Sequence, residues 1–243
     1  MSDIRDFAIK GHGGLDRWNQ FASISAHLSQ GGGLWALKHQ DGVLAEVDVT
    51  ADLHTERVSH GPFGDDGVHT DFSPGRVAIA SSTGAVVEEL LEPRKSFAGH
   101  VQATPWNRLQ LAYFVGTAMW TYLTQPFCFT MPGFVITEGD PLVEDGASYR
   151  RMNVTWPSYL ATHNANQVLY LDGSGLIHRH DYTVEITGNT EAAHYMSDYE
   201  EVSGIQVPTR HRIYPRGENG QVVKDFLVVS IDDSNVQYVP KKN

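Results

Sequence analysis

Apolar and polar residues alternate along most of this chain. From Ala22 to Leu28 every second residue is apolar, and the residues between them are serines and a histidine. Because successive side chains of a β-strand point to opposite faces, this pattern predicts a strand with one buried face and one solvated face. Similar patterns predict strands at Val43–Val49, Leu53–Ser59, Val68–Phe72, Arg76–Ser81, Tyr149–Trp156, Gln167–Asp172, Leu176–Ile186, Glu191–Val202, Thr209–Arg216 and Val222–Val239. The chain is therefore expected to be mainly β, with about eleven strands and a few helices.

Short turns separate the predicted strands. Asp41-Gly42, Gly61-Pro62 and Ser73-Pro74-Gly75 each lie between two of them. Connections of this length join antiparallel neighbours, whereas parallel strands need long crossovers. Since most strands have one apolar face, we predict a single curved antiparallel sheet, an open half-barrel that encloses a central helix.

The segment from Pro105 to Gln125 has a helical rather than a strand period. Its apolar residues recur at intervals of three and four, with Thr104 as the expected N-cap: Trp106, Leu109, Tyr113, Gly116, Trp120 and Leu123. Gly116 on this face costs about 1 kcal/mol relative to alanine, but it lets the helix backbone approach a sheet closely. We therefore predict that this helix packs on the concave face of the sheet.

Glycines mark the shorter elements near the N-terminus. Ser2 and Asp3 are expected to cap a short helix that Gly11 ends, and a second short helix is expected after Gly13-Gly14. Gly31-Gly32-Gly33 lies between two predicted strands and is interpreted as a loop or bulge.

Composition excludes several classes of function. The 243 residues contain no internal repeat or linker, so one domain spanning residues 1–243 is expected. A formal net charge of -11 opposes binding to nucleic acid or to an anionic membrane surface. Cys128 is the single cysteine, which excludes an intrachain disulfide and a thiolate metal cluster. The first residues lack the apolar run of a signal peptide, so a cytoplasmic location without membrane association is expected.

Three stretches of sequence resemble a known family. They are HGGLDRW from His12, the helix PWNRLQLAYFVGTAMWTYLTQPF from Pro105, and the run that contains HRHDYTVEI and AAHYMSDYEEVSGIQVPTRHRIYPR. In their order along the chain they resemble the LolA-like proteins, which include lipoprotein carriers and an enzyme of violacein synthesis. The resemblance implies one LolA-like domain, an open curved antiparallel half-barrel with helices in its concavity. It matches no catalytic residue onto this sequence.

The strand Leu176–Ile186 carries the candidate catalytic residues. Its even positions form the apolar face and include His178, His180 and Tyr182. An imidazole can act as general acid or base, and a phenol can donate to a developing oxyanion. We predict that these three side chains line one pocket; the alternative is that they are buried polar groups satisfied by the backbone.

Aromatic residues of the predicted helix are candidates for ligand binding. Trp106, Tyr113 and Trp120 are expected in the core, and in a half-barrel with an internal helix they could also form the wall of a ligand cavity. His194 is added to this predicted binding set. The eight histidines before His178 are expected mostly on loops and solvated faces.

A metal site has weaker support. The spacing of His178, His180 and Glu185 matches the first metal motif of cupins, with His194 or His211 as a further ligand. On a regular strand, however, Glu185 lies on the face opposite both histidines. We therefore predict no bound metal and no cofactor.

Two classes of function follow from these patterns. The first is a cofactor-independent enzyme of isomerase, cyclase or lyase type, which encloses a small hydrophobic or aromatic ligand and uses histidine and tyrosine for proton transfer. The alternative is a noncatalytic carrier of such a molecule, and a cupin-like metal-dependent enzyme is less favoured. Burial of unpaired polar groups costs a few kcal/mol, which favours the enzyme. The sequence gives no indication of oligomeric state.

Overall fold

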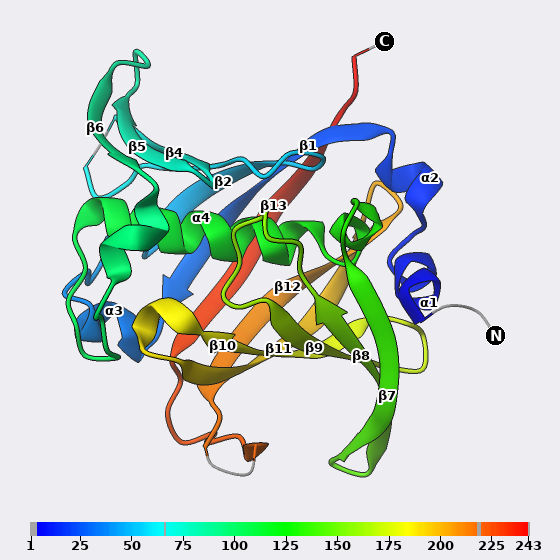
Figure 1. Cartoon of the computed structure of the whole chain (residues 1–243). Coiled ribbons are helices and arrows are strands. Elements are labelled where there is room, and N and C mark those ends of the chain that lie inside the picture. Colours follow the sequence, from blue (N-terminus) through cyan, green and yellow to red (C-terminus); the bar gives the residue numbers. More distant parts are fainter. Residues whose placement is uncertain (1–3, 66, 218–219, 243) are drawn as a thin grey trace.

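The computed structural model describes residues 4–65, 67–217 and 220–242, which form one open antiparallel sheet with helices on its concave side (Figure 1). The predicted fold class is confirmed, although the described residues form thirteen strands in one sheet instead of about eleven. Ser2 and Asp3, predicted as helix caps, lie outside the described residues.

The strands form two meanders, β1 to β6 and β7 to β13, in each of which successive strands are neighbours in the sheet. Their bounds are β1 (Phe21–Gly31), β2 (Glu46–Asp52), β3 (Val58–Gly61), β4 (Val68–Ser73), β5 (Arg76–Ser81), β6 (Val86–Leu91), β7 (Val135–Glu144), β8 (Ala147–Thr155), β9 (Asn166–Leu171), β10 (Ile177–Val184), β11 (Thr190–Val202), β12 (Ile205–Pro215) and β13 (Val229–Pro240). The helices are α1 (Ile4–Gly11), α2 (Leu15–Trp18), α3 (Gly33–Leu37) and α4 (Arg108–Thr124), with 3-10 turns η1 (Pro93–Phe97), η2 (Phe127–Thr130) and η3 (Glu185–Thr187).

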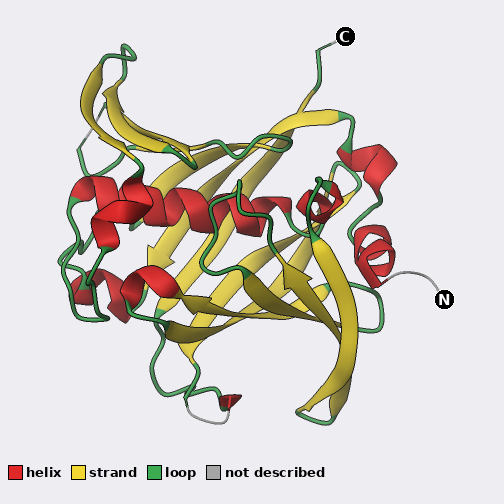
Figure 2. Ribbon diagram, in the orientation of Figure 1, coloured by secondary structure: helices red, strands yellow, loops and turns green. Residues whose placement is uncertain are grey.

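The order of strands in the sheet explains the position of α4. The order is β6-β5-β4-β3-β2-β1-β13-β12-β11-β10-β9-β8-β7, so β1 and β13 pair in the middle while β6 and β7 form the two edges. The connection from β6 to β7 must therefore pass from one edge to the other. Figure 2 shows α4 in that connection, lying across the sheet.

Helix α4 is buried on all sides, not only along one stripe. Fifteen consecutive residues, from Gln110 to Thr124, are buried. The N-cap is Asn107 rather than the predicted Thr104, because the Asn107 side chain accepts from the Gln110 backbone while the Gln110 side chain accepts from the Asn107 backbone. None of the helices in the described residues is long and apolar enough to cross a membrane.

Gly116 brings α4 against one half of the sheet, as predicted. A Cβ atom at this position would lie 2.3 Å from Cγ of Phe72 on β4, so only glycine allows this approach. The helix lies against strands β2 to β6. The facing half of the sheet, β10 to β13, stands further from the helix, and the space between them contains the candidate site.

The predicted strands are present, with shifted ends, and two strands and one α-helix were not predicted. The sequence pattern places the second and third strands earlier than β2 and β3 begin. Strands β6 and β7 were missed, and Gly33, interpreted as part of a loop, begins the short helix α3.

Candidate functional site

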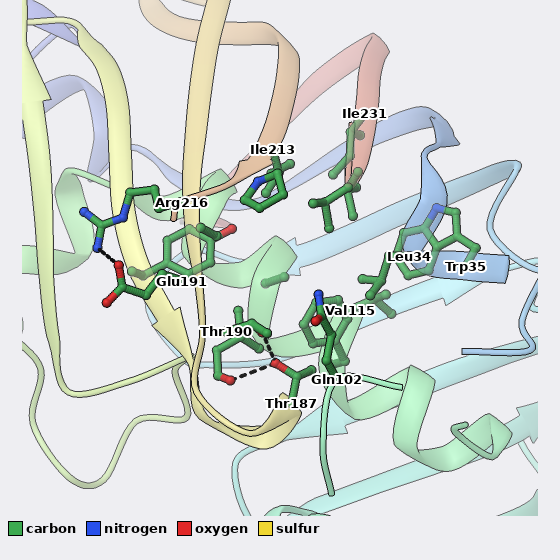
Figure 3. Close-up of a pocket in the computed structure, with 18 of the residues that line it drawn as sticks. Leu34, Trp35, Gln102, Val115, Thr187, Thr190, Glu191, Ile213, Arg216 and Ile231 are labelled. Atoms are coloured by element: carbon green, nitrogen blue, oxygen red, sulfur yellow. Dashed lines mark hydrogen bonds and ion pairs between the residues drawn. The ribbon is translucent and has the colours of Figure 1, made fainter. Parts of the chain in front are cut away.

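A cavity of about 550 Å³ lies between α4, α3 and strands β10 to β13 (Figure 3). We call it the α4 cavity, because α4 forms one wall through Phe114, Val115, Ala118, Met119 and Tyr122. This face of α4 differs from the one that carries Gly116 and contacts Phe72. Ligand pockets in proteins typically enclose about 300–1,000 Å³, so the α4 cavity is large enough for a small molecule.

Most of the cavity wall is apolar. Across from α4, the lining side chains come from α3, from the strands and from the segments that join them: Leu34, Trp35, Val184, Ala192, Ile213, Val228, Val229 and Ile231. Figure 3 shows Leu34 and Trp35 on the side opposite Arg216 and Glu191. Burial of apolar ligand surface against such walls contributes about 25 cal/mol per Å².

Two tyrosine hydroxyls provide a polar group in this apolar wall. Tyr122 of α4 and Tyr182 of β10 both line the cavity, and their hydroxyl oxygens are 2.7 Å apart. Burial raises the pKa of both phenols above the ordinary value, and the hydrogen bond between them opposes this for Tyr122. Both hydroxyls are therefore protonated at neutral pH.

A layer of buried histidines lies behind the two tyrosines. His163 stacks on Tyr182, with ring centroids 4.5 Å apart, and its Nε2 lies 3.4 Å from the Tyr122 hydroxyl. His194 packs edge-on against Tyr122 at 4.3 Å. Burial lowers the pKa of His163 to about 3, with the charge of Arg94 adding to the effect, and lowers that of His194 well below the ordinary value. These imidazoles are neutral at physiological pH.

The layer continues through His211 to a buried carboxylate. His194 Nε2 and His211 Nδ1 are 2.8 Å apart, and His211 Nε2 lies 3.7 Å from Oδ2 of Asp233. The side chain of Asp233 is fully buried, and neither of its oxygens has a hydrogen-bond partner among the described residues. This series of side chains ends on β13, and none of His194, His211 and Asp233 lines the cavity.

Charged and amide side chains gather where the cavity meets solvent. Arg216 donates to Asp181 at 2.8 Å and to Glu191 at 2.9 Å, and the Glu191 side chain is 45 % exposed. Gln30, Gln102 and Asn189 also line the cavity. Arg216 thus forms ion pairs with two carboxylates. The part of the cavity that meets solvent therefore has no excess of positive charge.

The structure contradicts the predicted placement of His178. The β9–β10 pairing is irregular between Ile177 and Arg179, so His178 and Arg179 both reach the carboxylate of Glu144, at 3.3 Å and 2.9 Å. Such a bulge places two consecutive side chains on the same side of the sheet. His178 therefore lies on the face opposite Tyr182, and the prediction that the three residues share one wall is wrong for His178.

His180 and Tyr182 do lie on the concave face, but only Tyr182 lines the cavity. His180 is fully buried, and its Nε2 donates to Oε1 of Gln167 at 2.7 Å. Burial lowers the pKa of His180 to about 3. Its Nδ1 carries the lone pair, has no partner among the described residues and is shielded from solvent. His180 is therefore a weak base without access to the cavity.

None of the predicted binding residues lines the α4 cavity. Trp120 is fully buried on the other face of α4, where its indole Nε1 donates to the Asp52 carbonyl at 2.9 Å. Tyr113 packs against Phe72 at 5.8 Å between ring centroids. Trp106 precedes α4 and packs behind Phe114 at 4.8 Å, and His194 lies behind Tyr122.

Sequence reasoning missed several residues of this region. His60 and His163, expected to be solvated, are buried. Tyr122 and Phe114 were overlooked because only one stripe of the helix was assigned to the interior, and the run of apolar residues around the whole helix was the available signal.

The cupin-like metal set does not assemble. Glu185 lies in η3 and forms an ion pair with Arg94, whereas His178 lies on the other face of the sheet from His180. Within the described ranges there is no group of three or more histidine, cysteine, aspartate or glutamate side chains that could hold a metal ion.

Solved structures show the same architecture. A LolA superfamily protein from Nitrosomonas europaea superposes with a TM-score of 0.54 at 9 % identity, covering 99 % of this chain and 93 % of that one. The chain has a LolA-like fold. A DUF1329 family protein from Desulfovibrio piger gives a TM-score of 0.55 at 12 % identity, with 97 % of this chain and 91 % of the other covered.

A third LolA-like structure is a domain from Vibrio parahaemolyticus described as an outer membrane lipoprotein-sorting protein. It gives a TM-score of 0.53 at 7 % identity over 97 % of this chain and 93 % of that chain. No family model and no curated protein matches the sequence. The predicted resemblance to LolA-like proteins is thus confirmed at the level of the fold.

Proposed function

We propose that this protein binds a small lipophilic molecule in the α4 cavity. The observation that carries the proposal is the cavity itself, about 550 Å³ of space with predominantly apolar walls between the helix and the sheet. An apolar cavity with a few converging polar groups is the usual form of a small-molecule site. Related folds include a protein described as lipoprotein-sorting, which also favours a hydrophobic ligand.

Binding without catalysis is the simpler form of this proposal. His180 and His194 lie behind the cavity wall, and low pKa values make such imidazoles poor general bases near neutral pH. His178 lies on the other face of the sheet. These positions favour the carrier over the acid–base enzyme.

A substitution that fills the cavity tests the proposal. Ala118→Phe places a ring into the space beside Met119 and Tyr122, and we expect at least about a tenfold loss of affinity for N-phenylnaphthylamine, a fluorescent apolar probe. Thermal unfolding should show that the variant stays folded. Val87→Phe, at an exposed position of β6, is the matched control and should bind like the wild type. Equal affinity of the two variants would contradict binding in this cavity.

A cofactor-independent isomerase, cyclase or lyase is the second candidate. It is favoured by the chain of Tyr182, Tyr122 and His163, in which two phenols at the cavity are followed by an imidazole at 3.4 Å. Such a chain could move a proton to or from a bound molecule. The test is incubation with a metabolite extract: an enzyme forms a product that Tyr122→Phe/Tyr182→Phe does not form, whereas a carrier leaves the extract unchanged.

A further inference from the structure

The two tyrosine hydroxyls of the α4 cavity carry one hydrogen more than the short bond between them uses. Each phenol carries one O–H hydrogen, and one of the two is used in the 2.7 Å bond between Tyr122 and Tyr182. Among the described residues, the further hydrogen-bond partner of the pair is Nε2 of His163, 3.4 Å from the Tyr122 oxygen. Hydrogen bonds from hydroxyl groups are normally about 2.5–3.0 Å long, so this contact is weak.

The position of Tyr122 and Tyr182 makes the hydroxyl hydrogen that their mutual bond does not use available to a ligand in the cavity. Both tyrosines line the cavity, whereas the residues around them on the sheet side are buried. When Tyr122 donates to Tyr182, the O–H of Tyr182 has no acceptor among the described side chains. A buried donor without a partner costs about 1–3 kcal/mol, which a ligand oxygen at this point would recover.

The charges around the cavity disfavour an anionic ligand. Among the residues that the structure describes, Arg216 and Glu191 are the charged residues of the lining, and Arg216 already pairs with Glu191 and with the buried Asp181. A carboxylate or phosphate inside the cavity would therefore meet an arginine whose charge two carboxylates already balance, although its Nε has no hydrogen-bond partner among the described residues. An ion without a partner in an apolar environment is strongly disfavoured.

We propose that the α4 cavity selects uncharged lipophilic molecules that carry a hydrogen-bond acceptor oxygen, such as a ketone or an ester, where they meet Tyr122 and Tyr182. This inference rests on the proposed binding function and specifies its ligand class. The acceptor oxygen takes the hydrogen that the pair does not use internally, and the apolar part of the molecule packs against α4 and β11 to β13.

Matched probes of equal chain length test the selection. The affinities of undecane, methyl nonyl ketone and undecanoate are measured by their displacement of N-phenylnaphthylamine from the cavity. The wild type and the double variant Tyr122→Phe/Tyr182→Phe are compared. The double variant removes both hydroxyls and keeps both rings. We expect its affinity for the ketone to fall about fivefold, the value of one neutral hydrogen bond, while its affinity for undecane stays within about twofold. Undecanoate should bind the wild type at least about tenfold more weakly than the ketone.

Two single variants complete the experiment. Tyr122→Phe leaves the Tyr182 hydroxyl without an internal partner, so affinity for the ketone should be retained. Tyr199→Phe removes a hydroxyl that donates to the Ile177 carbonyl, away from the cavity. This variant should bind the ketone and undecane with the affinities of the wild type.

The outcomes separate the inference from the proposed function. Suppose that undecane binds the wild type and that the double substitution weakens binding of the ketone no more than binding of undecane. The proposed selection of an acceptor oxygen is then wrong, and the binding function stands. Tightest binding of undecanoate would overturn the preference for uncharged ligands. If none of the three probes binds the wild type, the proposed function and the inference both fail.

Discussion

Glu56 is a carboxyl group in the protein interior. It is 3 % exposed, its Oε2 accepts from the Ala161 backbone at 2.9 Å, and its Oε1 has no partner among the described residues. Burial raises the pKa of Glu56 to about 8. The folded protein therefore holds a proton on Glu56 at neutral pH, whereas the unfolded chain, with a pKa of about 4.3, has released it.

Replacing Glu56 by glutamine should stabilise the protein at alkaline pH. A raised pKa means that the folded state binds more protons than the unfolded state between about pH 4 and about pH 8, so stability falls as pH rises through this range. Glu56→Gln cannot ionise. We expect equal free energies of unfolding for variant and wild type near about pH 4, and an advantage of about 2–4 kcal/mol for the variant near about pH 8, measured by urea unfolding.

The control is Glu138→Gln, which removes an exposed carboxylate paired with Arg150. Such a surface ion pair stabilises a protein by about 0–1 kcal/mol. Glu138→Gln should therefore lower the free energy of unfolding by this small amount, whereas Glu56→Gln should raise it. An equal pH dependence in wild type and Glu56→Gln would show that Glu56 is ionised in the folded protein.

His178 shows where prediction of the site from the sequence fails. The alternation around His180 and Tyr182 correctly indicates that both side chains point into the concavity. The same alternation fails at His178, because the bulge adds one residue on β10 without a partner on β9. A bulge depends on the neighbouring strand, so no pattern within residues 176–186 could reveal it.

At the scale of elements, the approach of α4 to the sheet depends on Gly116. Alanine is the better helix former by about 1 kcal/mol, yet its Cβ would lie 2.3 Å from the Phe72 ring. Since the clash involves a packed side chain of β4, we expect Gly116→Ala to lower the free energy of unfolding by about 1–3 kcal/mol in urea. Gly75→Ala is the control, because a Cβ there meets no atom within 4 Å. A more stable Gly116→Ala protein would contradict this packing.

The missed elements show what alternation cannot detect. Strand β6 is exposed on both faces along most of its length, and β7 has no fully buried residue. Edge strands of this kind need no apolar face, so their sequences lack the period-two signal. Helix α3 is five residues long and follows Gly32, whose positive φ ends β1. Its first turn is held by hydrogen bonds to the carbonyls of Leu227 and Val228, which are distant in sequence.

At the scale of the whole molecule, several imidazoles are buried and neutral at physiological pH. Burial lowers the pKa of five histidines far below the ordinary value of 6.5: to about 4 for His12, to about 3 for His60, His163 and His180, and well below 6.5 for His194. They come from the turn after α1, from β3, from the segment before β9, from β10 and from β11. Their titration is therefore a property of the entire fold.

These histidines should make the protein unfold in mild acid. A lowered histidine pKa means that the unfolded chain binds more protons, so the stability that these histidines contribute is complete above about pH 6.5 and is lost as pH falls towards about 3. Each buried histidine contributes a loss of up to about 1.4 kcal/mol per pH unit, or about 7 kcal/mol per pH unit for five, and the raised pKa of Glu56 offsets about 1.4 kcal/mol per pH unit of this loss. Domains are stable by about 5–15 kcal/mol, so we expect cooperative unfolding with a midpoint near about pH 5, followed by circular dichroism and tryptophan fluorescence.

His60 distinguishes this cause from general acid unfolding by carboxylates. Neither of its ring nitrogens has a partner among the described residues, so His60→Leu removes one proton-binding group without breaking a hydrogen bond to its side chain. The midpoint of acid unfolding should move to lower pH, and the transition should become less steep by about one proton. His27→Gln, at an exposed position where Asp48 and Glu46 raise the histidine pKa, should not lower the midpoint. A wild-type protein that stays folded at about pH 4, or a His60→Leu midpoint equal to that of the wild type, would show that the buried imidazoles do not control stability in acid.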